Sequence, residues 1–465
     1  MKIDGGKVSV ETFSYHFKRN VIIIFALLHL ANYFIKSPFL FYLCCGMLTY
    51  IFISAVRVLP KVTRGICLAL MLLGICIVFW IKLPFDAWLL CIDKNGNLIT
   101  LFILVPLMFL PFSYNDYQEE LKHVAQVHMQ SLLPFCVLTF SVVHIFGVVI
   151  SIGAVNLVFE LFKNNAKLYN AEKTFMATLL RGYCSSGFWS PAWASILVVT
   201  TQMSISWIEI IPWGIGFFLI SLALDTIAVW FKIRQNPEKY PKLEAKEDVK
   251  VDWKQIYILI GLSAALIGII AVMSKITPWD LMVIIPIVAI VFPVVIALLQ
   301  NKVQNYKAGI KEYYDKSVLN VMSQVALFTA AGFLSKALEF SGVGAIIPKL
   351  LPVWMYQYPV LLIGSIMLLM IVPSLLGLHP VVIGTALVAT IVPASIGLTD
   401  MSFALTIIVG WALAILISPF SATSLIAGGL LNCSPWDISL GLNGKFGVFN
   451  VLFFSALIAL INGLL

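Results

Sequence analysis

The chain has 465 residues, of which 61% are hydrophobic and only 11% are charged, whereas an ordinary soluble domain carries about a quarter charged residues. This composition excludes a soluble globular protein and predicts an all-α polytopic membrane protein, because apolar runs of roughly 17 to 25 residues recur along the whole sequence. The net charge of +8 lies in short loops without interleaved aromatic residues. It therefore argues against nucleic acid as a partner and favours positive-inside topology.

The apolar runs predict about 11 transmembrane helices. Their approximate bounds are 21–35, 38–56, 66–83, 98–113, 174–203, 207–231, 255–273, 277–299, 317–338, 402–432 and 445–465. Two further regions, 131–162 and 352–395, fit either ordinary spans or re-entrant hairpins. Treating both as hairpins puts the loops rich in Lys and Arg on the side of the amino terminus. We therefore predict two hairpins, a cytoplasmic amino terminus and a location in the plasma or inner membrane.

The basic, proline-containing loop in the middle of the chain divides it into halves of similar length. The predicted parts are a cytoplasmic amino terminus with the first span (1–37), repeat 1 (38–231), a cytoplasmic linker (232–254) and repeat 2 (255–465). Repeat 1 holds the hairpin 131–162 and the helix 174–203, and repeat 2 holds the hairpin 352–395 and the helix 402–432.

Two stretches of the first half match the second half in the same order. "SVVHIFGVVISIGAV" (141–155) shares five identities with 374–388, and "SPAWASILVVTTQMSISWIEI" (190–210) shares six with 418–438. In the predicted topology an odd number of crossings separates the two copies. The repeats are therefore expected to be inverted, an arrangement that supports alternating access.

The matched "SPAWAS" and "SPFSAT" each place a proline in the middle of a long apolar helix. Pro191 and Pro419 are expected to break these helices, freeing amino ends that suit an anion and carbonyl groups that suit a cation. The candidate binding residues around the two breaks are Ser190, Trp193, Ser195, Ser418, Ser421, Thr423 and Ser424. Proline kinks that serve packing alone remain the alternative.

The predicted hairpin tips, "SVVHIFG" and "SLLGLHP", supply a second set of candidates. They are Ser141, His144, Gly147, Gly377 and His379, since a re-entrant turn needs residues that tolerate open backbone and a buried histidine is costly. Each histidine equally fits a hydrogen bond to a neighbouring helix. Arg181 fits either a charge facing the substrate or a side chain that snorkels to the surface, and Asp225 is expected at the interface.

No nucleotide-binding or metal-binding motif occurs, so we expect no cofactor, no metal and no enzymatic activity. Uphill transport would use a coupling ion, H⁺ or Na⁺, or an exchanged solute. The predicted function is secondary transport of a small organic anion of the carboxylate type. A carrier of a lipid-linked phosphate and a cation/proton antiporter are the alternatives, and membrane lipids are the expected surroundings.

Two segments, "ALFTAAGFLSKALEFSGVGAIIPKLL" (326–351) and "WALAILISPFSATSLIAGGLL" (411–431), resemble the ion transporter superfamily, and within it the citrate and divalent-anion/sodium symporters. The resemblance implies two inverted repeats, each with a re-entrant hairpin and a broken helix, together with an elevator mechanism and a homodimer. Sodium-coupled members carry Ser-Asn-Thr at the hairpin tips. The tips here read "VHIFG" and "GLHPV", which favours coupling through His379 or exchange.

Overall fold

The computed structural model describes residues 10–59, 61–114, 117–243, 251–342 and 357–464. Within these ranges every regular element is a helix, and no strand forms. Ten of the described helices are long and apolar enough to cross a membrane, and an eleventh is added if the bent pair Val303–Ser317 and Met322–Ser341 is one span. The predicted all-α, multi-pass architecture is confirmed, and the chain is a multi-pass membrane protein.

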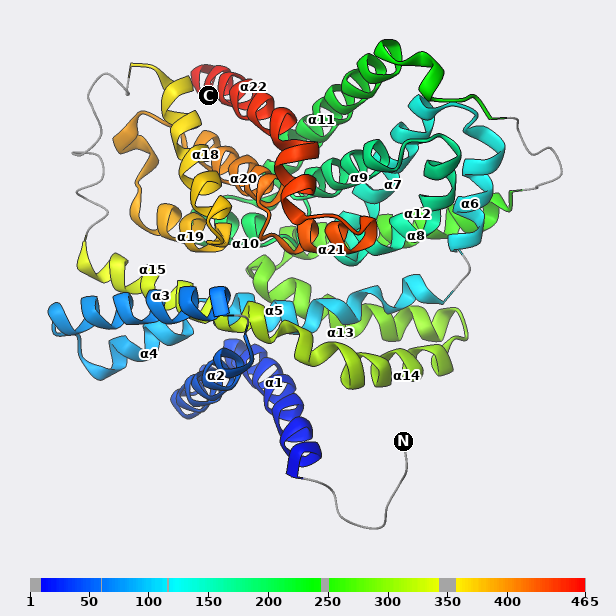
Figure 1. Cartoon of the computed structure of the whole chain (residues 1–465). Coiled ribbons are helices and arrows are strands. Elements are labelled where there is room, and N and C mark those ends of the chain that lie inside the picture. Colours follow the sequence, from blue (N-terminus) through cyan, green and yellow to red (C-terminus); the bar gives the residue numbers. More distant parts are fainter. Residues whose placement is uncertain (1–9, 60, 115–116, 244–250, 343–356, 465) are drawn as a thin grey trace. The chain divides into compact units, whose positions relative to one another are not determined.

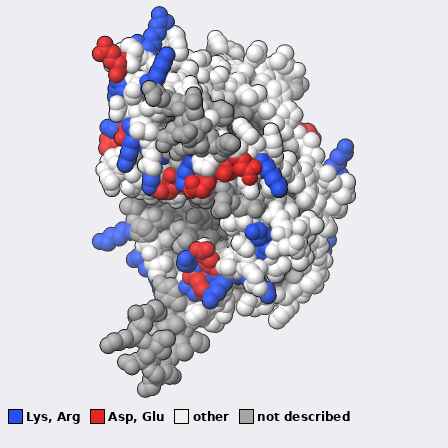
Figure 2. All heavy atoms as spheres, turned by 90° about the vertical axis from the view of Figure 1, so that its right-hand side faces the viewer, with Lys and Arg blue, Asp and Glu red and all other residues white. Residues whose placement is uncertain are grey.

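Large apolar side chains cover much of the described surface. Phe39, Trp80 and Leu299 are each more than 70% exposed, which is costly in water and favourable against lipid tails. On the face drawn in Figure 2, charged side chains gather in a few groups with broad uncharged areas between them. The chain thus has the surface of a membrane protein as well as its helix lengths.

The chain divides into two compact units, 1–111 with 282–341 and 112–281 with 342–465. Each unit contains residues from both predicted repeats, so the units cut across the division at the central loop. The predicted hairpin 352–395 begins in residues 352–356, which lie outside the described ranges.

Unit 1 is organised around one helix, α15 (Met322–Ser341), which packs against four others of the unit. Asn95 Nδ2 donates to the carbonyl oxygen of Phe328 at 2.9 Å, and Gly332 leaves room for the Asn95 side chain. In Figure 1, α3 (Lys61–Trp80) runs along α15. The elements of this unit are α1 (Val10–Ile35), α2 (Pro38–Val58), α3 (Lys61–Trp80), α4 (Phe85–Asp93), α5 (Gly96–Leu104), η1 (Val105–Ser113), α13 (Leu281–Leu299), α14 (Val303–Glu312), η3 (Tyr313–Ser317), η4 (Val318–Val321) and α15.

Unit 2 contains both predicted hairpins and both predicted broken helices. Its elements in the first half are α6 (Tyr117–His128), α7 (Leu132–Ile150), α8 (Gly153–Leu168), α9 (Glu172–Ser186), α10 (Ala194–Gln202), α11 (Trp207–Gln235), η2 (Pro237–Lys239) and α12 (Trp253–Ile276). In the second half they are α18 (Pro359–Leu375), α19 (Pro380–Thr390), η6 (Pro393–Ile396), α20 (Asp400–Ile417), α21 (Ala422–Leu431), η7 (Asp437–Leu442) and α22 (Asn443–Leu464).

The same order of elements and the same contacts occur twice in unit 2. A helical hairpin, α7–α8 or α18–α19, is followed by a broken helix, α9–α10 or α20–α21, and then by a long helix, α11 or α22. In each copy the first arm of the hairpin packs on the first part of the broken helix, and the long helix packs on both. The second segment of each broken helix packs on the other copy. Helix α10 packs on α19 and α20, and α21 packs on α8, as Figure 1 shows.

Candidate functional site

Both apolar helices are interrupted where the sequence carries Ser-Pro. Helix α9 ends at Ser186 and α10 begins at Ala194, while α20 ends at Ile417 and α21 begins at Ala422. Pro191 and Pro419 lie inside these interruptions, as expected of a residue that lacks the N–H needed to continue a helix. Each proline therefore stands between two helices, where the sequence predicts a break.

The serines of the two Ser-Pro pairs make equivalent hydrogen bonds. Ser190 Oγ donates to the carbonyl oxygen of Val148 at 3.0 Å, and Ser418 Oγ donates to that of Ser374 at 2.6 Å. Both carbonyl groups belong to the last turn of a hairpin's first arm, where a helix leaves its carbonyl oxygens unpaired. Each serine thus joins the break in its own copy to the adjoining hairpin.

The turns of the two hairpins correct the predicted first tip. The α7–α8 turn lies at Ser151 and Ile152, where Ser151 has φ of 54°. The predicted tip residues Ser141, His144 and Gly147 lie instead within α7. The α18–α19 turn holds Gly377, with φ of 95°, and His379, the two residues proposed for the second tip.

Because equivalent turn residues stand at 151 and 377, and equivalent acceptors at 148 and 374, the hairpins correspond at a spacing of 226 residues. The match of 141–155 with 374–388 is therefore seven residues out of register. The match of the Ser-Pro segments agrees with the structure, since both pairs of helix segments keep their spacing of 228 residues.

His144 is buried between α7, α9 and α11, and both of its ring nitrogens have partners. Trp189 Nε1 donates to His144 Nε2 at 3.1 Å, so Nε2 is the acceptor and the proton lies on Nδ1. His144 Nδ1 then donates to Ser185 Oγ at 2.8 Å, and the imidazole stacks on Phe218 with centroids 3.8 Å apart. The ring connects the first hairpin to the first broken helix in its neutral form.

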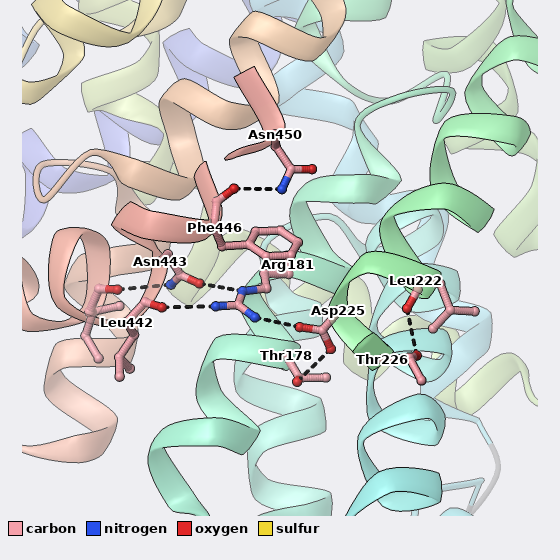
Figure 3. Close-up of polar contacts among 10 residues, drawn as sticks. Thr178, Arg181, Leu222, Asp225, Thr226, Leu442, Asn443, Phe446 and Asn450 are labelled. Carbon is pink, nitrogen blue, oxygen red and sulfur yellow. Dashed lines mark hydrogen bonds and ion pairs between the residues drawn. The ribbon is translucent and has the colours of Figure 1, made fainter. Parts of the chain in front are cut away.

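Arg181 is the cation of a buried ion pair rather than a free charge. Its Nη1 donates to Asp225 Oδ1 at 2.8 Å, Nε to Asn443 Oδ1 at 2.9 Å and Nη2 to the carbonyl oxygen of Leu442 at 3.0 Å. Phe446 lies 4.0 Å from the guanidinium carbon. Figure 3 shows how this cluster joins α9, α11 and the start of α22.

The expectation that Asp225 lies at an interface is wrong. Its side chain is 1% exposed and its second oxygen accepts from Thr178 Oγ1 at 2.8 Å. The pair places one positive and one negative charge together in low dielectric, where either charge alone is costly. Its role in this geometry is to join three elements.

The amino end of α21 is rich in hydroxyl groups that bind one another. Ser421 Oγ accepts from the N–H of Ser424 at 3.2 Å and lies 2.9 Å from Thr423 Oγ1 and 3.0 Å from Ser424 Oγ. Ser421 is thus the N-cap of α21, a position that serine favours. The candidates Ser421, Thr423 and Ser424 therefore lie together at the first turn of α21.

The amino end of α10 lacks such a cap. Trp193 precedes the helix and gives it no side-chain hydrogen bond, and among the described residues nothing accepts from the N–H groups of Ala194, Ser195 and Ile196. Trp193 Nε1 and Ser195 Oγ are also buried without a partner. Buried polar groups are nearly always satisfied, so this end of α10 is the candidate binding element.

The remaining candidates lie away from the amino end of α10 in the sequence, and two of them have a structural role. His379 caps α19, its Nδ1 accepting from the N–H of Val381 at 3.2 Å. Gly147 faces α9, where an added Cβ would lie 2.6 Å from Ser186 Oγ, so it permits close helix packing. Ser141 lies half-buried in the middle of α7.

Three residues outside the candidate set position this site. Trp189 and Ser185 hold His144, and Trp207 Nε1 donates to the carbonyl oxygen of Trp189 at 2.7 Å. Trp189 stands next to the Ser-Pro break in the sequence, which was a signal for it. Nothing in the local sequence indicates which residues Trp189, Ser185 and Trp207 contact. In the described residues, no group of three or more His, Cys, Asp or Glu side chains is arranged to hold a metal ion.

No family model matches the chain, and no curated protein matches it in sequence. Among solved structures, the chain is similar to the YdaH transporter of Alcanivorax borkumensis, whose crystal structure is described as revealing an unusual topology. The TM-score is 0.48 and the sequence identity 14%, and the match covers 87% of this chain and 99% of the other.

Proposed function

We propose that the chain is a secondary transporter that moves a small organic anion across a membrane by alternating access. The observation that carries the proposal is the buried amino end of α10, where backbone N–H groups, Trp193 Nε1 and Ser195 Oγ have no partner. Hydrogen-bond donors at a helix amino end, with its partial positive charge, suit a carboxylate. A bound anion would satisfy groups that are unsatisfied without it.

The duplication in unit 2 supports transport over simple binding. Two copies of hairpin and broken helix, crossed so that α10 meets α19 and α21 meets α8, suit a site reached from either side in turn. The proposal includes inverted orientation of the copies, elevator movement, a homodimer and a cytoplasmic amino terminus. Coupling is by H⁺, by Na⁺ or by exchange, with His379 and the hydroxyl groups of α21 as the candidate groups.

Cation/proton antiport is the weaker candidate. It requires a buried carboxylate free to change its charge, and Asp225 is the only buried Asp or Glu among the described residues. Asp225 is held by Arg181 and Thr178. A charge held by two donors in this way does not readily exchange ions.

The test is uptake of a panel of labelled organic anions into proteoliposomes, with sodium and proton gradients imposed separately. We expect saturable uptake of at least one anion, lost on addition of detergent. If no anion moves under either gradient while a fluorescent lipid phosphate is flipped, the proposal fails in favour of the lipid carrier.

Variants at α10 sharpen this test. Trp193→Phe and Ser195→Ala each remove a buried polar atom that has no hydrogen-bond partner within the described chain, so the melting temperature should hold or rise while KM rises about tenfold or more. The matched control is Ser263→Ala, which removes a buried hydroxyl bound within its own helix. Unchanged KM in both α10 variants would place the substrate elsewhere.

A further inference from the structure

We infer that the site takes an anion with a single negative charge and an apolar remainder, and that it rejects dicarboxylates and tricarboxylates. The inference rests on the proposed function and adds the substrate class. It follows from the charges buried around the site, from the difference between the two broken helices, and from the side chains beside α10.

The described interior supplies no net positive charge to an anion. Arg181 and Asp225 are the only Lys, Arg, Asp or Glu residues that are buried in the described ranges, and they pair at 2.8 Å. Three guanidinium nitrogens of Arg181 already donate to Asp225, Asn443 and Leu442. Attraction for the substrate must therefore come from neutral donors and helix ends.

The two breaks differ in the donors that they leave unpaired: within the described residues, the first turn of α21 has the N–H groups of Ala422 and Thr423 without an acceptor but no unpaired side-chain donor. At α10 three backbone N–H groups, an indole N–H and a hydroxyl are unpaired. At α21 the Ser421 oxygen already accepts from Ser424 N–H, and three hydroxyl oxygens crowd the first turn. A helix amino end carries the equivalent of about half a positive charge, which suits one carboxylate.

The hairpin turns do not add a second anion site. The amino end of α19 is capped by His379. At α8 the N–H groups of Ala154 and Val155 donate to the carbonyl oxygens of Ser151 and Ile152. A second carboxylate would enter this interior without a counter-charge, and burial of an unpaired charge is strongly unfavourable.

The surroundings of the α10 end are aromatic and apolar. The Trp193 ring lies 5.2 Å from the Tyr183 ring and directly against Gly187. On α10 itself Ile196, Leu197 and Val198 are fully buried. An apolar or aromatic group beside the carboxylate gains favourable contacts here, whereas a polar one loses its water.

The test uses matched anions that differ in charge. Proteoliposome uptake of labelled phenylacetate is competed with unlabelled phenylacetate, phenylsuccinate and citrate at one pH where all are fully ionised. We expect phenylacetate to compete at a concentration at least tenfold lower than the other two. Ser195→Ala should weaken competition by phenylacetate, whereas Ser263→Ala should leave it unchanged.

The outcomes separate the two proposals. Equal or stronger competition by phenylsuccinate or citrate overturns the single-charge inference and leaves anion transport standing. If no anion of the labelled panel enters the proteoliposomes under either gradient, labelled phenylacetate included, anion transport is overturned and the inference with it. Preferential uptake of the monoanion that is unaffected by Ser195→Ala and Trp193→Phe overturns the assignment to α10.

Discussion

Ser418 Oγ lies 2.6 Å from the carbonyl oxygen of Ser374, so that the break between α20 and α21 is bonded to the last turn of α18. Ser190 and Val148 repeat the bond in the other copy. The recurrence of one contact at equivalent places indicates that each hairpin and its broken helix form one structural piece.

Ser418→Ala should destabilise the protein by about 1–3 kcal/mol, because the bond to the Ser374 carbonyl oxygen is lost, leaving that oxygen only the N–H of Gly377, and because the N–H of Phe420 loses its acceptor. The expected result is a melting temperature several degrees lower in detergent. Ser395→Ala is the control, since that serine donates to Val392 within an exposed turn and its loss should have little effect. Equal melting temperatures for the two variants would contradict a structural role for the bond.

Replacement of His144 by glutamine should lower the transport rate but preserve the shape of its pH dependence between about pH 5 and 8. Glutamine offers one donor and one acceptor, as the neutral imidazole does for Ser185 and Trp189. Uptake at a series of pH values measures this. A pH profile that flattens in His144→Gln would show that His144 carries the proton.

The buried pair predicts strong coupling between two variants. Arg181→Met leaves Asp225 charged and unpaired, and Asp225→Leu does the same to Arg181, so each should cost about 3–5 kcal/mol. The double variant removes both charges and should recover most of that loss. Thermal unfolding of the four proteins measures the coupling. Additive losses in the double variant would mean that the two charges do not stabilise each other.

Gly187→Ala should disturb the candidate site through Trp193. The new Cβ would lie 2.5 Å from the indole ring, which must move and take Nε1 with it, so we expect KM to rise several-fold. Gly216→Ala is the matched control, because no atom lies within 4 Å of its added Cβ. Similar kinetics in both variants would remove Trp193 from the site.

The sequence predicted the helix breaks because proline acts locally, through its missing N–H and its fixed ring. The first hairpin turn was not predicted at Ser151, because Ser151 takes a positive φ there, a conformation that glycine adopts more easily. The turn was predicted instead at the nearby Gly147. The helix breaks and the hairpin turn each depend on a few neighbouring residues, but only the break can be recognised from a residue type, proline.

The partners of Arg181 and His144 could not be predicted in the same way. Asp225 lies on the next long helix, Asn443 is 262 residues away from Arg181, and Ser185 is 41 residues from His144. Such pairs arise only when helices have packed. A charged residue in an apolar helix indicates that a partner exists, without indicating which one.

The crossed packing of α10 on α19 and of α21 on α8 also constrains how the protein is made. Helix α10 leaves the ribosome long before α19 and α20, so its buried face stays uncovered while about two fifths of the chain is synthesised. Neither copy completes its own packing, because each contributes a helix that the other covers. The last helices to be synthesised therefore finish the folding of the first.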